Sequence, residues 1–238
     1  MNCLNCNTEL NSNFCPDCGQ PKTLKRINGY YIVHEIEHVL HFERGILYTI
    51  KELITNPGQN IRNYLTENRS RLVKPIIFII VTSLIYSVSN HFFHFQDGYM
   101  SFLDSQKTTT SAILKWVQVN LGYSNIMMGI FIALWTKLFF KKRDYNIFEI
   151  LILLCFVMGI GMLIYAIFGL VYGLTHLNIM QFAGIAAFIY STWAIGNFYD
   201  RGKASSYIKA FFAYILGMIT FSLAIMIVGT LIDLVIKH

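Results

Sequence analysis

The hydrophobic pattern changes near Pro75, from a mixed polar and apolar segment to long apolar runs. A helix that crosses the hydrocarbon core of a bilayer needs about 20 mostly apolar residues. About five such helices are predicted, over residues 75–93, 125–140, 147–174, 179–198 and 210–236. The third is longer than the core is thick, so we expect it to tilt, or to bend at Gly159 and Gly161.

Apolar residues before Pro75 recur at the spacing of one helix face, at Ile32, Ile36, Val39, Leu40, Ile46, Leu47, Ile50, Leu53 and Ile54. The pattern stops at Asn56-Pro57-Gly58 and resumes at Ile61, ahead of a basic run. One interpretation is an amphipathic helix in the membrane interface, with Arg62 and the other basic residues near lipid phosphates. The other is a cytosolic helix packed on the N-terminal segment. We expect the interfacial helix.

Composition and charge support a membrane protein. Only 13% of the residues are charged, against roughly a quarter in soluble domains. Lys and Arg gather before the first predicted span, between the second and third, and after the fourth, which predicts a cytosolic N-terminus and an external C-terminus. The net charge of +6 follows from this topology and from anionic lipids, and nucleic acid is not expected as a partner. The first residues, MNCLNCNTEL, do not resemble a cleavable signal peptide.

Four of the five cysteines form two C-x-x-C pairs, Cys3 with Cys6 and Cys15 with Cys18. Two such knuckles close a tetrahedral shell of four thiolates around one zinc ion, with no coordination position left open. The competing interpretation, two redox dithiols, needs a thioredoxin-like βαβ context that the pattern lacks. We therefore predict one structural zinc per chain in a ribbon over residues 1–26, and Cys155 as apolar filling.

His34-Glu35-Ile36-Glu37-His38 matches the H-E-x-x-H pattern of zinc metalloproteases. On a helix the two histidines would share a face, with Glu35 as general base. Glu37 departs from the usual uncharged spacing, and no third ligand is evident, although His41 continues the face. The alternatives are an accessory metal site or a plain polar face. We favour the polar face and expect no enzyme.

Other polar positions leave two further alternatives open. One set of residues lies at the predicted outer ends of the helices: His91, His94, His176, Asp233 and His238. These residues could bind a metal or move protons, or they could simply mark where the helices leave the lipid. Hydroxyls within the spans could line an oligomeric channel, or serve helix packing: Thr82, Ser83, Ser191, Thr192 and Thr220. The centres of the predicted spans lack ionisable residues, which argues against an ion-coupled transporter.

The N-terminal CLNCNTELNSNFCPDCGQ and the stretch GILYTIKELITNPGQNIRNYLTENRSRLVKP together resemble an uncharacterised bacterial family of zinc-ribbon membrane proteins, a domain of unknown function. The resemblance is closest over residues 3–75, and its motif positions are Thr49, Leu53, Pro57, Gly58, Tyr64, Leu65, Arg69, Arg71 and Pro75. The chain departs from the family at Glu67-Asn68-Arg69, where Gly-Lys-Arg is usual. The layout is also similar to Yip-type five-helix membrane proteins. The resemblance implies an architecture and no activity.

Three parts are therefore predicted: a zinc ribbon (1–26), an amphipathic juxtamembrane segment (27–74) and a five-helix transmembrane domain (75–238), in an all-α protein of the bacterial inner membrane. The expected function is a non-enzymatic docking or sensing platform, with the bilayer and a protein at the ribbon as partners. The alternatives are an oligomeric channel or transporter and, lastly, the metalloprotease. Gly169-x3-Gly173 in the third span could pack against a second copy.

Overall fold

The computed structural model describes residues 2, 6, 8, 9, 13–17, 45–69, 71–95, 108–177 and 179–236. The chain divides into two compact units, Met1–Glu43 and Arg44–His238. These described residues form eight α-helices and no named strand, so the all-helical expectation is confirmed for this part of the chain. In the first unit, an isolated antiparallel bridge joins Asn2 and Glu9.

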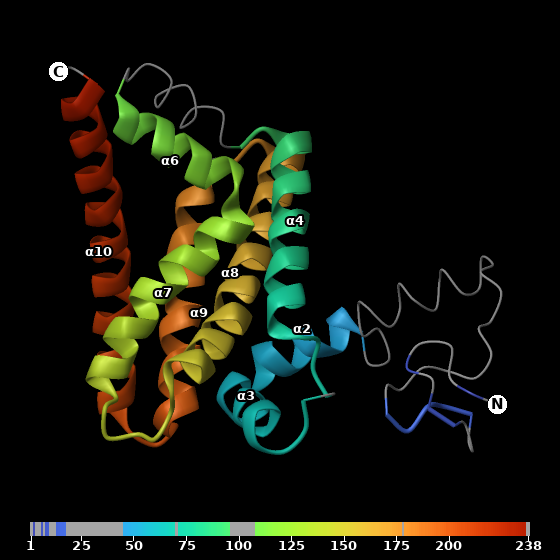
Figure 1. Cartoon of the computed structure of the whole chain (residues 1–238). Helices are drawn as coiled ribbons and strands as arrows, with labels where there is room; N and C mark the ends of the chain where they lie inside the picture. Colours follow the sequence, from blue (N-terminus) through green and yellow to red (C-terminus); the bar gives the residue numbers. More distant parts are fainter. Residues whose placement is uncertain are drawn as a thin grey trace. The chain divides into compact units, whose positions relative to one another are not determined.

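The second unit is a bundle of helices that alternate in direction. Its elements are α2 (Ile46–Thr55), α3 (Pro57–Thr66), α4 (Pro75–Phe93), α6 (Thr109–Val119), α7 (Leu121–Phe139), α8 (Ile147–Thr175), α9 (Met180–Asp200) and α10 (Ala204–Ile236). Five of them, α4 and α7 to α10, run alongside one another, and α6 crosses one end of the bundle (Figure 1). The short helices α2 and α3, together called the hairpin, lie at the other end, which we call the base.

The long helix α8 is the centre of this bundle. It contacts α4, α7 and α9, and 56% of its most apolar stretch is buried, against 17% for α10. The helix α8 continues from Ile147 to Thr175 with no break at Gly159 or Gly161, where a bend was one of the two expectations. Gly159 instead makes room for a neighbour, since a Cβ there would lie 2.6 Å from a ring carbon of Phe78 on α4.

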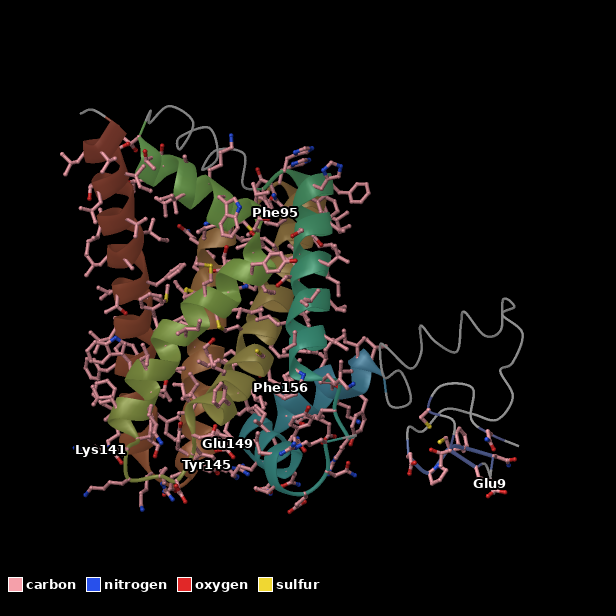
Figure 2. The ribbon with its side chains drawn as sticks, viewed as in Figure 1. Glu9, Phe95, Lys141, Tyr145, Glu149 and Phe156 are labelled. Atoms are coloured by element: carbon pink, nitrogen blue, oxygen red, sulfur yellow. The ribbon has the colours of Figure 1, made fainter. Side chains whose placement is uncertain are left out.

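The N-terminal half of α8 contacts the hairpin at the base. Tyr64 of the hairpin meets Phe156 of α8 edge to face, with ring centroids 5.4 Å apart. Figure 2 shows Lys141, Tyr145 and Glu149 at the base, and Phe95 at the opposite end. The aromatic contact of Phe156 therefore joins α8 to the hairpin.

Three helices in the described part of the chain are long and apolar enough to cross a membrane: α4, α8 and α10. The pair α6 and α7, bent by 104°, would make a fourth span if taken together. This is fewer than the five spans expected from the sequence. The helix α9 is not among them, because Gln181, Asn197 and the Ser191-Thr192 pair make it less apolar.

Candidate functional site

Two of the four predicted zinc ligands lie in the described part of the first unit. The Sγ atoms of Cys6 and Cys15 are 3.4 Å apart, and Cys15 is buried with 3% of its surface exposed. Two thiolates on one tetrahedral zinc, with Zn–S bonds of about 2.3 Å, would lie about 3.8 Å apart. Thr8 donates a hydrogen bond of 2.7 Å to Asp17 and links the two knuckle segments. The donor set therefore fits a zinc site.

The other two ligands, Cys3 and Cys18, lie outside the described residues. Among the residues that the structure describes, no group of three or more His, Cys, Asp or Glu side chains could hold a metal ion. The zinc site remains a prediction that rests on the cysteine spacing and on the closeness of Cys6 and Cys15.

The second candidate site is the joint between the hairpin and the bundle. Arg62 of α3 donates from Nη1 to the carbonyls of Asn197, at 2.9 Å, and Phe198, at 2.5 Å, in the last turn of α9. Its Nη2 donates to Oε1 of Gln59, at 2.9 Å. The last carbonyls of a helix lack partners within the helix and carry its negative dipole end. Arg62 thus fixes the hairpin to α9, and the lipid contact expected from the sequence stays a prediction.

Close backbone approach completes the joint. Pro57 begins α3, and a Cβ on the next residue, Gly58, would overlap the backbone of Asn197. A larger residue could not occupy this position without moving one of the two helices. On α2, the carbonyl of Leu53 accepts a hydrogen bond of 3.1 Å from the Tyr190 hydroxyl of α9. Leu53 and Ile61 are fully buried in the core that the hairpin shares with the bundle.

The hairpin itself is closed by side chains that bind backbone groups. Nδ2 of Asn60 donates to the carbonyls of Glu52, at 2.9 Å, and Asn56, at 3.0 Å. The buried hydroxyl of Thr49 accepts from the backbone N–H of Val73, at 3.1 Å. The connection to α4 is therefore fastened to α2.

Arg71 fixes the other side of the same connection. It donates to the Tyr48 hydroxyl and forms a 3.0 Å ion pair with Glu52. The hydrogen bond to Tyr48 is the largest cause that raises the pKa of Arg71, so the guanidinium stays charged at any physiological pH. On α3, burial raises the pKa of the Tyr64 hydroxyl above its usual range. Both ends of the hairpin are thus held by specific polar contacts.

The helix α2 has a second apolar face that the bundle does not cover. Leu47 is 78% exposed and Ile54 is 54% exposed, while Thr49 and Leu53 on the packed face are buried. The breaker predicted at Asn56-Pro57-Gly58 is a joint between two helices. The helix predicted from the apolar periodicity is confirmed for α2. The earlier part of that pattern, Ile32 to Leu40, lies outside the described residues.

A second set of polar contacts joins the loops at the base. Asp200 at the end of α9 pairs with Arg143 at 2.8 Å and with Lys203 at 3.2 Å. The hydrogen bond from Lys203 is the main cause that lowers the pKa of Asp200. Lys137 donates to the carbonyl of Tyr145. The loops after α7 and α9 are thus cross-linked on the same side as the hairpin.

The structure does not bring the remaining candidate residues together as a site. His34, Glu35, His38 and His41 lie outside the described residues, as does His238. His91 and His94 are neighbours, with ring centroids 6.3 Å apart. Asp233 serves another purpose, since its carboxylate accepts from the backbone N–H of Thr109, at 3.2 Å, and from the Thr109 hydroxyl. Asp233 thereby holds the N-terminus of α6 on α10, where acidic groups are favourable.

Most of the hydroxyls proposed for a channel bind their own helices. Thr82, Ser191 and Thr220 donate to carbonyls three or four residues earlier, a common contact of buried hydroxyls in helices. The hydroxyls of Ser83 and Thr192 are buried with no partner in the described part of the chain. These contacts favour helix packing over a continuous polar path.

The small residues of α8 are used within the chain. A Cβ at Gly169 would overlap the ring of Phe95, and one at Gly173 would overlap the ring of Phe93. The aromatic rings after and at the end of α4 therefore fill the surface that the sequence suggested for a second copy. This correction removes the evidence that Gly169-x3-Gly173 offered for a homo-oligomer.

In the comparison with known proteins, one family model matches a segment of the chain. Residues 43–87 match a family described as a protein of unknown function, DUF3667. The matched segment contains the hairpin, its closing contacts and most of α4. No curated protein and no solved structure matches the chain. The resemblance in the juxtamembrane segment is therefore confirmed in part, while a likeness to ribbon or Yip-type proteins finds no support.

Proposed function

We propose that this chain is a non-enzymatic integral membrane protein whose N-terminal ribbon binds one structural zinc ion and docks a cytosolic partner. The observation that carries the proposal is the 3.4 Å approach of Cys6 and Cys15, which come from different C-x-x-C pairs. Four thiolates leave zinc no open position for water or substrate. A closed site of this kind stabilises a small binding module, because residues 1–26 are too few to form a core of their own.

The membrane part is proposed to have five spans, with α7 and α9 added to α4, α8 and α10. Two polar residues of α9 are turned inward, since Ser191 and Asn197 are only 1% and 3% exposed, whereas Gln181 in its first turn is exposed. Exposed large apolar residues of the same helix are Phe182, Ile185 and Ile189. The same holds for α7, whose Ser124, Asn125 and Thr136 are buried. A helix largely surrounded by protein tolerates polar residues that lipid would not.

The base of the bundle is proposed to face the cytosol. The loops and helix ends there carry most of the Lys and Arg of the second unit, namely Arg62, Arg69, Arg71, Lys74, Lys141, Lys142, Arg143, Arg201 and Lys203. At the opposite end the described residues include Lys115 on α6. Short cytoplasmic loops are enriched in basic residues. This orientation puts the N-terminus inside and the end of α10 outside, in the inner membrane.

The hairpin is proposed to anchor the docking segment at the membrane. Arg62 and Gly58 fix α3 on α9, so the chain leading from the ribbon enters the bundle at a defined point, Gly45. The exposed Leu47 and Ile54 of α2 suit the lipid interface. In this proposal the hairpin packs on the bundle with one face and meets lipid with the other; packing on the ribbon, the alternative considered from the sequence, is not part of it.

Affinity capture tests the docking role. The tagged full chain is isolated from gently solubilised membranes and compared with Cys15→Ser/Cys18→Ser and with the matched control Cys155→Ser, which changes a cysteine within α8. We expect bound proteins to be retained by the intact chain and by the control, and lost from the double variant. An identical set of bound proteins in all three samples would refute the docking role of the ribbon.

A further inference from the structure

The bundle contains a partly open cavity of about 300 Å³ away from the base. Six helices contribute to its wall, α4 and α6 to α10 (Figure 1). Much of the lining is apolar and polarisable: Met128, Met158, Met162, Met218, Phe188 and Phe221. A volume of this size is at the lower end of the range for small-molecule sites. Soft methionine side chains adapt to the shape of a bound molecule.

Polar groups without partners lie in the same wall. Asn125 and Ser124 at the start of α7 are 4% and 3% exposed. The Asn125 Nδ2 and the Ser124 Oγ are buried and have no hydrogen-bond partner in the described part of the chain. Buried polar groups are nearly always hydrogen-bonded, so these two adjacent groups, on residues that line one cavity, are available to bind a ligand.

The remaining polar lining is uncharged. It comprises the side chains of Tyr86, Tyr165, Tyr214 and Gln118, and none of the described residues around the cavity is acidic or basic. An ionic ligand would lose its hydration there with no counter-charge to replace it. The amide and hydroxyl donors instead suit a neutral molecule that carries a hydrogen-bond acceptor.

A second cavity, of about 260 Å³, adjoins the first and shares Tyr86, Gln118 and Leu121 with it. It is lined by Asn90, His91 and His94 at the end of α4. The Asn90 Oδ1 is a further buried polar atom with no partner among the described residues. The second cavity thus lies next to the first, on the side of the bundle end opposite the base.

We propose that this cavity binds a neutral, membrane-soluble carbonyl compound, of the chemical class of a quinone head group. Its flat apolar body would lie among the methionines and phenylalanines, and a carbonyl oxygen would accept hydrogen bonds from Asn125 and Ser124. This binding site does not depend on the ribbon or on zinc, so the docking role and the binding site can each be refuted while the other stands.

The binding test uses the full chain in lipid nanodiscs and 2,3-dimethyl-1,4-naphthoquinone, with 2,3-dimethylnaphthalene as a hydrocarbon of the same shape. Equilibrium binding is corrected with empty nanodiscs. Because one hydrogen bond contributes roughly tenfold in affinity, the quinone should bind at least about tenfold more tightly than the hydrocarbon. Equal binding of both compounds would mean an apolar cavity for lipid tails, and would overturn the proposal.

Two variants and a control locate the site. Asn125→Leu removes the amide, and should weaken quinone binding about tenfold while leaving the hydrocarbon unchanged. Thr136→Val is the control, because it removes another buried, unpartnered polar group from α7 away from the cavity. Gly161→Leu should abolish binding of both compounds by filling the cavity, since a Cβ at Gly161 meets only Ala187, at 3.9 Å.

Size-exclusion profiles first establish that each variant is folded. The proposal is overturned if Asn125→Leu and Thr136→Val have the same effect, or if Gly161→Leu binds the quinone as the original chain does. If Asn125→Leu does not fold, the comparison of quinone with hydrocarbon on the original chain, together with Gly161→Leu, still decides the question.

Discussion

Replacement of Arg62 by Gln is expected to loosen the hairpin from the bundle. The change removes two charged hydrogen bonds to the carbonyls of Asn197 and Phe198. A hydrogen bond to a charged group contributes about 1.5–3 kcal/mol, and water replaces part of the loss because Arg62 is only partly buried. We therefore expect the free energy of unfolding to fall by about 2 kcal/mol in total. For a chain of this length that corresponds to a Tm lower by roughly 4–8 °C.

The matched control is Arg69→Gln, which removes the same charge from an exposed position just after the hairpin. Thermal unfolding of both variants in detergent is followed by tryptophan emission, for which Trp193 is a suitable reporter because it packs against Tyr190 on α9. The control should change the Tm by less than about 2 °C, as surface substitutions do. If both variants lower the Tm equally, the effect is one of net charge and the role given to Arg62 is wrong.

Two further predictions concern the joint and the topology. Gly58→Ala should destabilise the protein by about 2 kcal/mol, because its Cβ would overlap the backbone of Asn197. The control is Gly202→Ala, where the nearest atom is 3.8 Å from the new Cβ, and it should leave the Tm nearly unchanged. Similar Tm values for the two variants would contradict the close approach of Gly58 to Asn197. Reporter fusions at the N-terminus and near Arg143 should read as cytosolic and one after His238 as external, whereas a cytosolic C-terminus would rule out five spans.

The long apolar helices could be predicted from the sequence because their signal is local. The first span was expected at 75–93 and α4 is Pro75–Phe93, where Pro75 begins the helix and His94 ends it with a positive φ of 49°. The third was expected at 147–174 and α8 is Ile147–Thr175. Both predictions needed only hydropathy and a residue that stops the helix.

Features that depend on distant residues could not be predicted in the same way. The contact between Arg62 and α9 could not be predicted, because its partners are more than a hundred positions away in the sequence. The helix α6 was missed because it is short and only weakly apolar, although Thr108 and Ser111 form a capping box that could have indicated its start. Gly159 was read as a hinge because a sequence does not show that Phe78 occupies the space beside it.

The candidate zinc ligands are a different case, since their spacing carries the chemistry. Two C-x-x-C pairs predict a four-thiolate site without any knowledge of the fold. The structure adds that the Sγ atom of Cys6, from the first pair, lies close to the Sγ atom of Cys15, from the second pair. The cavity behind Asn125 had no sequence signal at all, because its lining comes from six helices.

The metal content of the purified full chain shows whether the N-terminal unit is a zinc ribbon. We expect about one zinc per chain, because four thiolates form one tetrahedral shell. Cys15→Ser/Cys18→Ser should reduce this to near zero and leave the amount of protein in the membrane unchanged, while His34→Ala/His38→Ala should leave the zinc in place. A double-serine protein that still holds a full equivalent of zinc would contradict the account.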